Sequence, residues 1–227
     1  MGYVEGQNLA IDARWARNDL DRLPELAQEL VRLAPEVIVT GNTATTVAVG
    51  AATTRIPIVC VACTDPVSMG LVSNEARPGT NVTGMLARVE GLTSKQMELA
   101  LEVVPGMTKV GALINDSNPS NLVQRREAEA AAAKLQVTVV PAEVRAPNDF
   151  HPAFQMLVGQ GIKMALVLQD SMFLVERKRI ALAAAAARLA TMFSFRENVE
   201  DGGLMSYGID LRENYRRAAA YVGRICR

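Results

Sequence analysis

Short apolar, β-branched runs alternate along this chain with stretches of helical periodicity, and this alternation constrains the fold more than any other feature. The runs that read as strands are Leu9–Arg14, Val37–Thr40, Ile58–Cys63, Val110–Asn115, Val137–Val144, Met164–Gln169, Thr191–Phe195 and the short Leu204–Tyr207. The helical stretches are Asp21–Leu33, Thr43–Thr54, Leu92–Val104, Asn121–Leu135, Asp149–Gly159, Leu174–Leu189 and Leu211–Ile225. Strands that alternate with helices build parallel sheets covered on both faces. The sequence therefore predicts an α/β fold with doubly wound parallel sheets.

A helix stop at Pro105-Gly106 marks a change in organisation, because a new strand-helix-strand rhythm begins directly after it. The length of 227 residues allows two lobes of roughly 100 residues each. We expect an N-terminal lobe over residues 1–105, to which residues 208–227 return, and a C-terminal lobe over 106–207. A hinge is expected to join the two lobes.

The charge balance excludes one class of partner. There are 24 Lys+Arg and 24 Asp+Glu residues, so the formal net charge is zero, whereas nucleic-acid binding needs a surplus of basic side chains. We therefore expect no nucleic-acid partner. The polar first eight residues do not form a signal peptide, and no apolar run of about 18 residues is present to span a membrane.

Two of the three cysteines, Cys60 and Cys63, lie in one apolar strand pattern. A redox pair with this spacing usually sits at a helix start. Residues three apart on a regular strand point to opposite faces, which opposes a disulfide. We interpret both as buried free thiols. Cys226, next to the last residue, indicates neither a disulfide nor a redox site.

Polar side chains follow nearly every strand, where parallel sheets place their ligand sites. In the first half, Gly41-Asn42-Thr43-Ala44 either binds an anion at a helix start or only caps the helix. Asp65, before Pro66, either accepts hydrogen bonds from a ligand or starts a turn.

In the second half, polar residues follow three strands: the cluster Asp116–Asn121, then Asp170, then Glu197. The short strand that ends at Tyr207 is followed by Gly208. The cluster either lines a cleft or caps the next helix. Asp65, Asp170 and Glu197 together form a candidate ring of acceptors around a small polar ligand.

Catalytic patterns are poorly supported. The single histidine, His151, reads as an exposed residue, and no zinc-protease, nucleophile-elbow or nucleotide-binding motif is present. An enzyme that uses Asp65 or Asp170 as a base stays open as a minor alternative. The prediction is a protein without enzymatic activity, cofactor or metal.

Taken in order, the motifs resemble a known family, the ABC-transporter substrate-binding proteins that include tryptophan- and tyrosine-binding members. The matching segments are Gly2–Leu9, Asp21–Ala27, Val37–Gly41, Ile56–Val59, Asp65–Val67, Gly70–Val72, Ala76–Gly84, Arg196-Glu197 and Gly202–Gly208. The resemblance covers essentially the whole chain. It implies a type I periplasmic-binding-protein fold, whose two lobes close on a ligand by hinge motion.

The resemblance also implies a site, a partner and a location. The cleft between the lobes would be lined by Gly41, Asn42, Thr43, Ala44, Asp65, Asn115, Asn118, Asp170, Glu197 and Tyr207. The ligand would be a small molecule, an amino acid or an aromatic relative, and the partner an ABC permease of the inner membrane. The location would be periplasmic, or extracytoplasmic on a lipid anchor. A ligand-sensing module of a regulator or receptor with the same fold is the alternative.

Two features depart from the family pattern. Asn42-Thr43 stands where a proline is common, and Gln169-Asp170 stands where Pro-Asp is common. Set against the family, the sequence also reads as truncated at both ends. We therefore expect exposed sheet edges and a homodimer formed through them.

Overall fold

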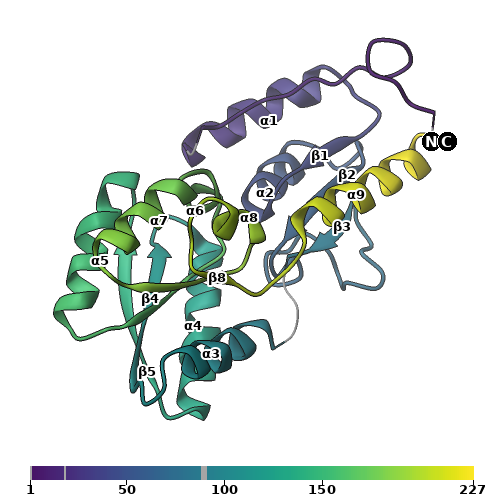
Figure 1. The fold of residues 1–227 in the computed structure, drawn as a ribbon. Helices are drawn as coiled ribbons and strands as arrows, with labels where there is room; N and C mark the ends of the chain where they lie inside the picture. The colour runs from purple at the N-terminus through teal and green to yellow at the C-terminus, as the bar shows by residue number, and fades with distance from the viewer. Residues whose placement is uncertain (1, 18, 88–90) are drawn as a thin grey trace. The chain divides into compact units, whose positions relative to one another are not determined.

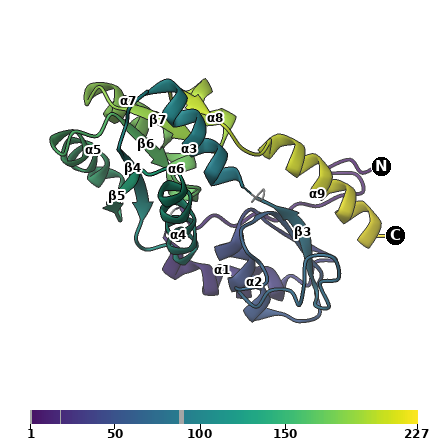
Figure 2. The same ribbon diagram turned by 90° about the horizontal axis from the view of Figure 1, so that it is seen from below.

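The computed structural model describes residues 2–17, 19–87 and 91–227. The chain divides into two compact units, Met1–Arg88 with Leu211–Arg227, and Val89–Asp210. The predicted boundary near residue 105 differs from this division, because helix α3 (Leu92–Val103) packs against α4 (Pro119–Lys134) in the second unit. Figures 1 and 2 show these two helices side by side.

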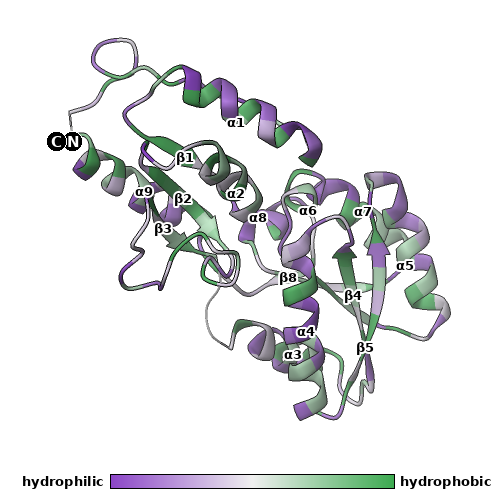
Figure 3. Cartoon of the chain, turned by 180° about the vertical axis from the view of Figure 1, so that it is seen from behind, coloured by the Kyte–Doolittle hydropathy of each residue, from purple (hydrophilic) through white to green (hydrophobic). Residues whose placement is uncertain are grey.

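The first unit is a three-stranded parallel sheet with helices on both faces, in the strand order β1-β2-β3. Its elements are η1 (Leu20–Arg22), α1 (Leu23–Arg32), β1 (Ile38–Thr40), α2 (Thr43–Ala52), β2 (Ile58–Cys63), β3 (Val82–Leu86) and α9 (Leu211–Ile225). Every residue of β2 is buried, as expected for the central strand of a covered sheet. Figure 3 shows its hydrophobic colouring.

Alternate residues of β2 face two different layers of helices. Ile58 and Cys60 belong to a cluster with residues of α1 and α2, whereas Val59 and Val61 pack against Ala218 of α9. This alternation is the period of two that a strand imposes. It explains why α9, far away in sequence, joins the first unit (Figure 1).

The second unit is a five-stranded parallel sheet in the order β5-β4-β6-β7-β8. Besides α3 and α4 its elements are β4 (Lys109–Asn115), β5 (Thr138–Val144), η2 (Pro147–Asp149), α5 (Phe150–Gly159), β6 (Met164–Val167), α6 (Ser171–Val175), α7 (Arg177–Ala186), β7 (Ala190–Phe193), α8 (Arg196–Glu200) and β8 (Met205–Ser206). One core cluster joins the sheet to α5, α6 and α7, and another joins it to α3 and α4. The doubly wound α/β fold predicted from the sequence is confirmed.

Some predicted elements are wrong. Residues 10–14 are not a strand, since this segment has no ladder partner and Ile11 is 62% exposed. The strand β3 was missed. The predicted helix Leu174–Leu189 is two helices, α6 and α7, that meet at Glu176.

The two strand cysteines are buried free thiols, as predicted, but they do not face opposite sides. Cys60 and Cys63 belong to the same core cluster. The pairing of β2 with β3 shifts register between them. This irregularity interrupts the alternation that the sequence argument assumed.

None of the helices within the described ranges is long and apolar enough to cross a bilayer. His151 is exposed in the first turn of α5, in agreement with its interpretation as a surface residue.

Candidate functional site

The second sheet has a topological switch point between β4 and β6. From β4 the chain runs outward to β5, and it then returns to the other side of β4 to form β6. Ligands of open α/β sheets bind at such a point, outside the carboxyl ends of the strands. Here these ends carry Asn115, the last residue of β4, and Asp170, which follows β6.

Asp170 joins the two sides of this switch point. One carboxylate oxygen, Oδ2, accepts hydrogen bonds from Nδ2 of Asn115 at 3.0 Å and Nδ2 of Asn118 at 2.7 Å. The other, Oδ1, caps α6 by accepting from the backbone N–H of Met172 at 2.7 Å and of Phe173 at 3.4 Å. The structure therefore brings together three of the predicted site residues, Asn115, Asn118 and Asp170.

The described donors to the Asp170 carboxylate are all neutral groups. Its side chain is buried, and within the described part of the chain no cationic group forms an ion pair with it. Four donors fill the acceptor positions of the carboxylate. The group therefore acts as a fixed negative charge behind Asn115 and Asn118 rather than as an open acceptor.

Two buried amides hold the segment before Asp170: Asn121, from the polar cluster noted in the sequence, and Gln124, which sequence reasoning missed. Asn121 and Gln124 of α4 both donate to the carbonyl of Gln169 at 2.9 Å, and Gln124 also accepts from the Gln169 N–H at 2.7 Å. The spacing of Asn121 and Gln124 with the buried Ala128 and Ala131 is that of one helix face. That spacing is the signal in the sequence that could have identified Gln124 as a buried residue.

The next two strands carry the remaining predicted residues of this unit. Glu197 lies in the first turn of α8 after β7, and Tyr207 follows β8 with its side chain 45% exposed. Beside them, Asp170, Ser194 and Asn198 line a hollow with Phe173 and other apolar residues, with room for about one water molecule.

Phe173 and Phe195, which lie beside these strand ends, have structural roles. Phe173 is buried in the core, where it meets Phe150 edge to face with ring centroids 5.9 Å apart. Phe195 is buried as well. Both side chains therefore serve the packing of the core.

In the first unit, the loop Gly41–Ala44 is tied to the loop after β2. Thr43 is buried, and its hydroxyl accepts from the Thr64 N–H at 2.7 Å and donates to the Thr64 carbonyl at 3.1 Å. Asn42 caps α2 in a capping box with Thr45. The capping interpretation is therefore confirmed for Asn42, and Thr43 positions Asp65 one residue beyond Thr64.

Asp65 occupies a turn with a left-handed backbone. Its φ is 49°, a region that Asp tolerates better than most residues. Its Oδ1 accepts a hydrogen bond from the backbone N–H of Ser68 at 3.4 Å. The turn interpretation holds, and the half-buried carboxylate remains beside the start of α2. The ring that would join Asp65 with Asp170 and Glu197 stays a prediction.

A polar cluster lies beneath this loop, inside the core of the first unit. The hydroxyls of Thr40 and Thr46 are 2.7 Å apart, and the Cys63 thiol donates to Thr46 at 3.7 Å. A hydrogen bond with the Cys60 thiol, together with burial, raises the pKa of Cys63 well above its usual range. In the described residues, no three His, Cys, Asp or Glu side chains form a group suited to a metal ion.

Two parallel-sheet units with polar groups at their strand ends define a protein of the solute-binding class. The model of the family described as "ABC transporter substrate binding protein" matches residues 1–227, and the chain belongs to this family.

Its relatives agree with this assignment. The chain is 29% identical over 209 residues to a "Tyrosine-binding protein" of Clostridioides difficile, covering 92% of this chain but only 60% of the relative. A solved "conserved domain protein" from Vibrio cholerae is 30% identical, with a TM-score of 0.91 over 99% of this chain and 75% of that one. A Streptococcus structure in complex with L-Trp shares the fold, with 24% identity and a TM-score of 0.90 over the same shares.

Proposed function

We propose that this chain is the solute-binding component of an ABC importer and that its ligand is an amino acid or an aromatic relative of one. The family match over residues 1–227 carries this proposal. The name of the tyrosine-binding relative supports an amino-acid ligand. The chain would then act by binding its ligand, with a movement of the two units. It would deliver the bound ligand to a permease in the membrane. The chain would work outside the cytoplasm and perform no catalysis.

The chemistry of the strand ends is consistent with a zwitterion. The negative charge of Asp170, held only by neutral donors, favours the ammonium group of a ligand over an uncharged group. The start of α2, with Gly41–Ala44, offers the positive end of a helix dipole to a carboxylate. Asp65, Asn115, Asn118, Glu197 and Tyr207 complete the proposed set of ligand-facing residues.

We also propose that two copies associate through the first sheet. On its outer side, β1 pairs with no other described strand, and Val39 is 49% exposed there. Unpaired strand edges with apolar side chains are sites of association.

The proposed function is tested by thermal unfolding of the purified chain with the twenty amino acids, tyramine and 4-hydroxybenzoate. A ligand at about 100 times its Kd stabilises the folded state by about 2.7 kcal/mol, which is a clear shift of the melting temperature. We expect the shift with an aromatic amino acid and not with tyramine, which lacks the carboxylate. No shift with any compound would contradict the proposal, and turnover of a bound compound would contradict the absence of catalysis.

A further inference from the structure

The chain passes between its two compact units twice, after residue 88 and after residue 210. Each passage has the same local pattern. It is preceded by a strand, β3 ending at Leu86 or β8 ending at Ser206, and it is followed by a helix, α3 from Leu92 or α9 from Leu211. In both connections, the chain leaves one unit after the end of a strand and enters the other unit at the start of a helix.

In the second unit, one buried side chain ties these two exits together. Gln96 lies on α3, and its Nε2 donates to the Tyr207 carbonyl at 2.7 Å and to the Ser194 hydroxyl at 3.0 Å. It is only 6% exposed. The helix after the first passage is thereby fixed to the residue that follows β8, just before the second passage.

The segment that Gln96 holds is packed tightly from the other side as well. The Tyr207 N–H donates to the Phe193 carbonyl at 2.9 Å. At Gly208, a Cβ atom would lie 2.1 Å from the Ser194 carbonyl oxygen, so only glycine fits there. Residues 207–208 are therefore anchored on the end of β7 before the chain leaves the unit.

The first unit repeats this arrangement with a different amide. Asn214 lies on α9, and its Nδ2 donates to the Val61 carbonyl at 3.2 Å and to the Leu86 carbonyl at 3.4 Å. Its side chain is buried. The helix after the second passage is thereby fixed to the last residue of β3, just before the first passage.

We propose that Gln96 and Asn214 are a matched pair of positioning residues that fix both connections at both of their ends. A side-chain amide has two N–H groups and can hold two acceptors from different segments at once. With both amides in place, Leu86 and Tyr207, which precede the two connections, and the helices that follow them keep their places on their own units when the orientation of the units changes. This inference rests on the proposed function, in which binding is coupled to movement of the units.

Loss of either amide leaves each unit folded but widens the range of orientations in the free protein. Affinity for a ligand that needs one orientation then falls in proportion to the population of that orientation. We expect an affinity lower by about tenfold for each variant, with binding itself retained.

The test uses Gln96→Met and Asn214→Leu, which keep side-chain size and remove the N–H donors. Gln124→Met and Asn81→Leu are matched controls. Gln124 is also a buried amide on a helix of the second unit, and Asn81 holds the Thr53 and Ile56 carbonyls at 3.1 and 2.8 Å. Neither control touches a connection.

The readout is the distance distribution between spin labels on the exposed positions 28 (α1) and 155 (α5), measured by pulsed electron resonance without ligand in a Cys226→Ser background. We expect a broader distribution for Gln96→Met and Asn214→Leu than for the controls and the parent. Distance distributions of equal width in the parent, the two amide variants and the controls would overturn the proposal.

A second variant guards against loss of folding. Gln96→Glu keeps the shape, has no donor when ionised, and regains one when protonated. Its distribution should narrow as the pH falls from 7 toward 4, whereas that of Gln96→Met should not. A width that is independent of pH, or that changes equally in both variants, would contradict the proposal.

Titration with L-tyrosine and L-tryptophan completes the test. Binding by the parent with weaker binding by both amide variants, but not by Asn81→Leu, supports the coupling. Equal affinities in all proteins would contradict it. If the parent binds neither amino acid, the proposed ligand class fails, while the ligand-free distances still decide the role of Gln96 and Asn214.

Discussion

At the scale of single residues, Asp170 shows how one carboxylate can organise a site. Its two oxygens accept four hydrogen bonds, which join the ends of β4 and β6 to the start of α6. The sequence singled out the position, because a charged residue after an apolar run is conspicuous. It could not reveal that Asn115 and Asn118 lie on the same oxygen, because this contact joins residues more than 50 positions apart.

We predict that Asp170→Asn destabilises the second unit by about 2 kcal/mol, since it leaves the amides of Asn115 and Asn118 facing another donor. The cap of α6 survives, because Asn also caps helices. Denaturant unfolding measures the loss. Asp116→Asn, which removes only an exposed ion pair with Arg145, is the control and should barely change the unfolding midpoint. Equal stability of parent and Asp170→Asn would refute this role of the carboxylate.

A second residue-scale prediction concerns the thiols. Cys60 and Cys63 are buried, which shields both thiols from a reagent in solution. Their mutual hydrogen bond raises the pKa of Cys63 and lowers that of Cys60, so burial is the protection that the two residues share. We expect iodoacetamide at pH 8 to modify only Cys226, which is partly exposed, while denatured protein reacts at all three cysteines. Mass spectrometry counts the added groups. Rapid modification of Cys60 in the folded chain would show that the core opens.

At the scale of elements, β3 depends on a close approach between backbones. Gly84 has φ of 153°, and a Cβ there would lie 2.0 Å from the Cys60 carbonyl oxygen. The strand therefore packs beside the irregular part of β2 only because residue 84 has no side chain. Cys60 and Gly84 are also the last pair before the register shift, beyond which Cys63 pairs with Leu86.

We predict that Gly84→Ala destabilises the first unit by about 3 kcal/mol or more, because backbone atoms of β2 cannot move aside easily. Gly159→Ala on α5 is the matched control, with no atom within 4 Å of the added methyl group. It should be neutral or stabilise the protein by up to about 1 kcal/mol. Thermal unfolding compares the two variants. A similar effect of both would show that β3 can move away from β2 to make room for the added methyl group.

Elements with strong periodicity were predictable, and those defined by their neighbours were not. The sequence predicted β2 and α9 with the observed bounds, because their burial patterns are continuous. It failed at residues 10–14, where β-type residues pair with no described strand. It also missed β3, since Gly84 weakens a strand pattern and its reason lies in a contact 24 positions away. For the same reason, the amides Gln96 and Asn214 carried no signal.

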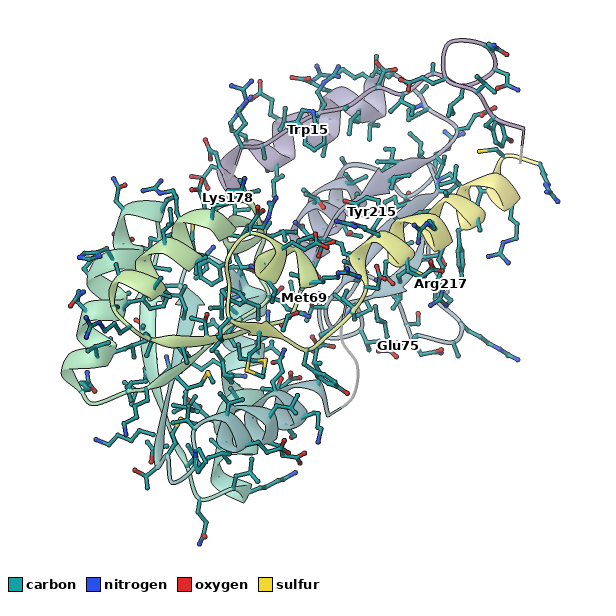
Figure 4. All side chains as sticks on the ribbon, in the orientation of Figure 1. Trp15, Met69, Glu75, Lys178, Tyr215 and Arg217 are labelled. Atoms are coloured by element: carbon teal, nitrogen blue, oxygen red, sulfur yellow. The ribbon has the colours of Figure 1, made fainter. Side chains whose placement is uncertain are left out.

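At the scale of the whole molecule, the proposed association has a definite test. The edge strand β1 exposes Val39, and the irregular segment that runs along α1 exposes Ile11 and Trp15, the latter 74% exposed (Figure 4). Light scattering should give a mass that rises toward twice 24.4 kDa with concentration. Val39→Lys places a charge on the strand edge and should return the protein to a monomer. Val175→Lys, at another exposed valine on α6, should leave association unchanged. If the parent chain keeps the mass of one copy at all concentrations, the edge of β1 is protected without a partner, and the proposed dimer is wrong.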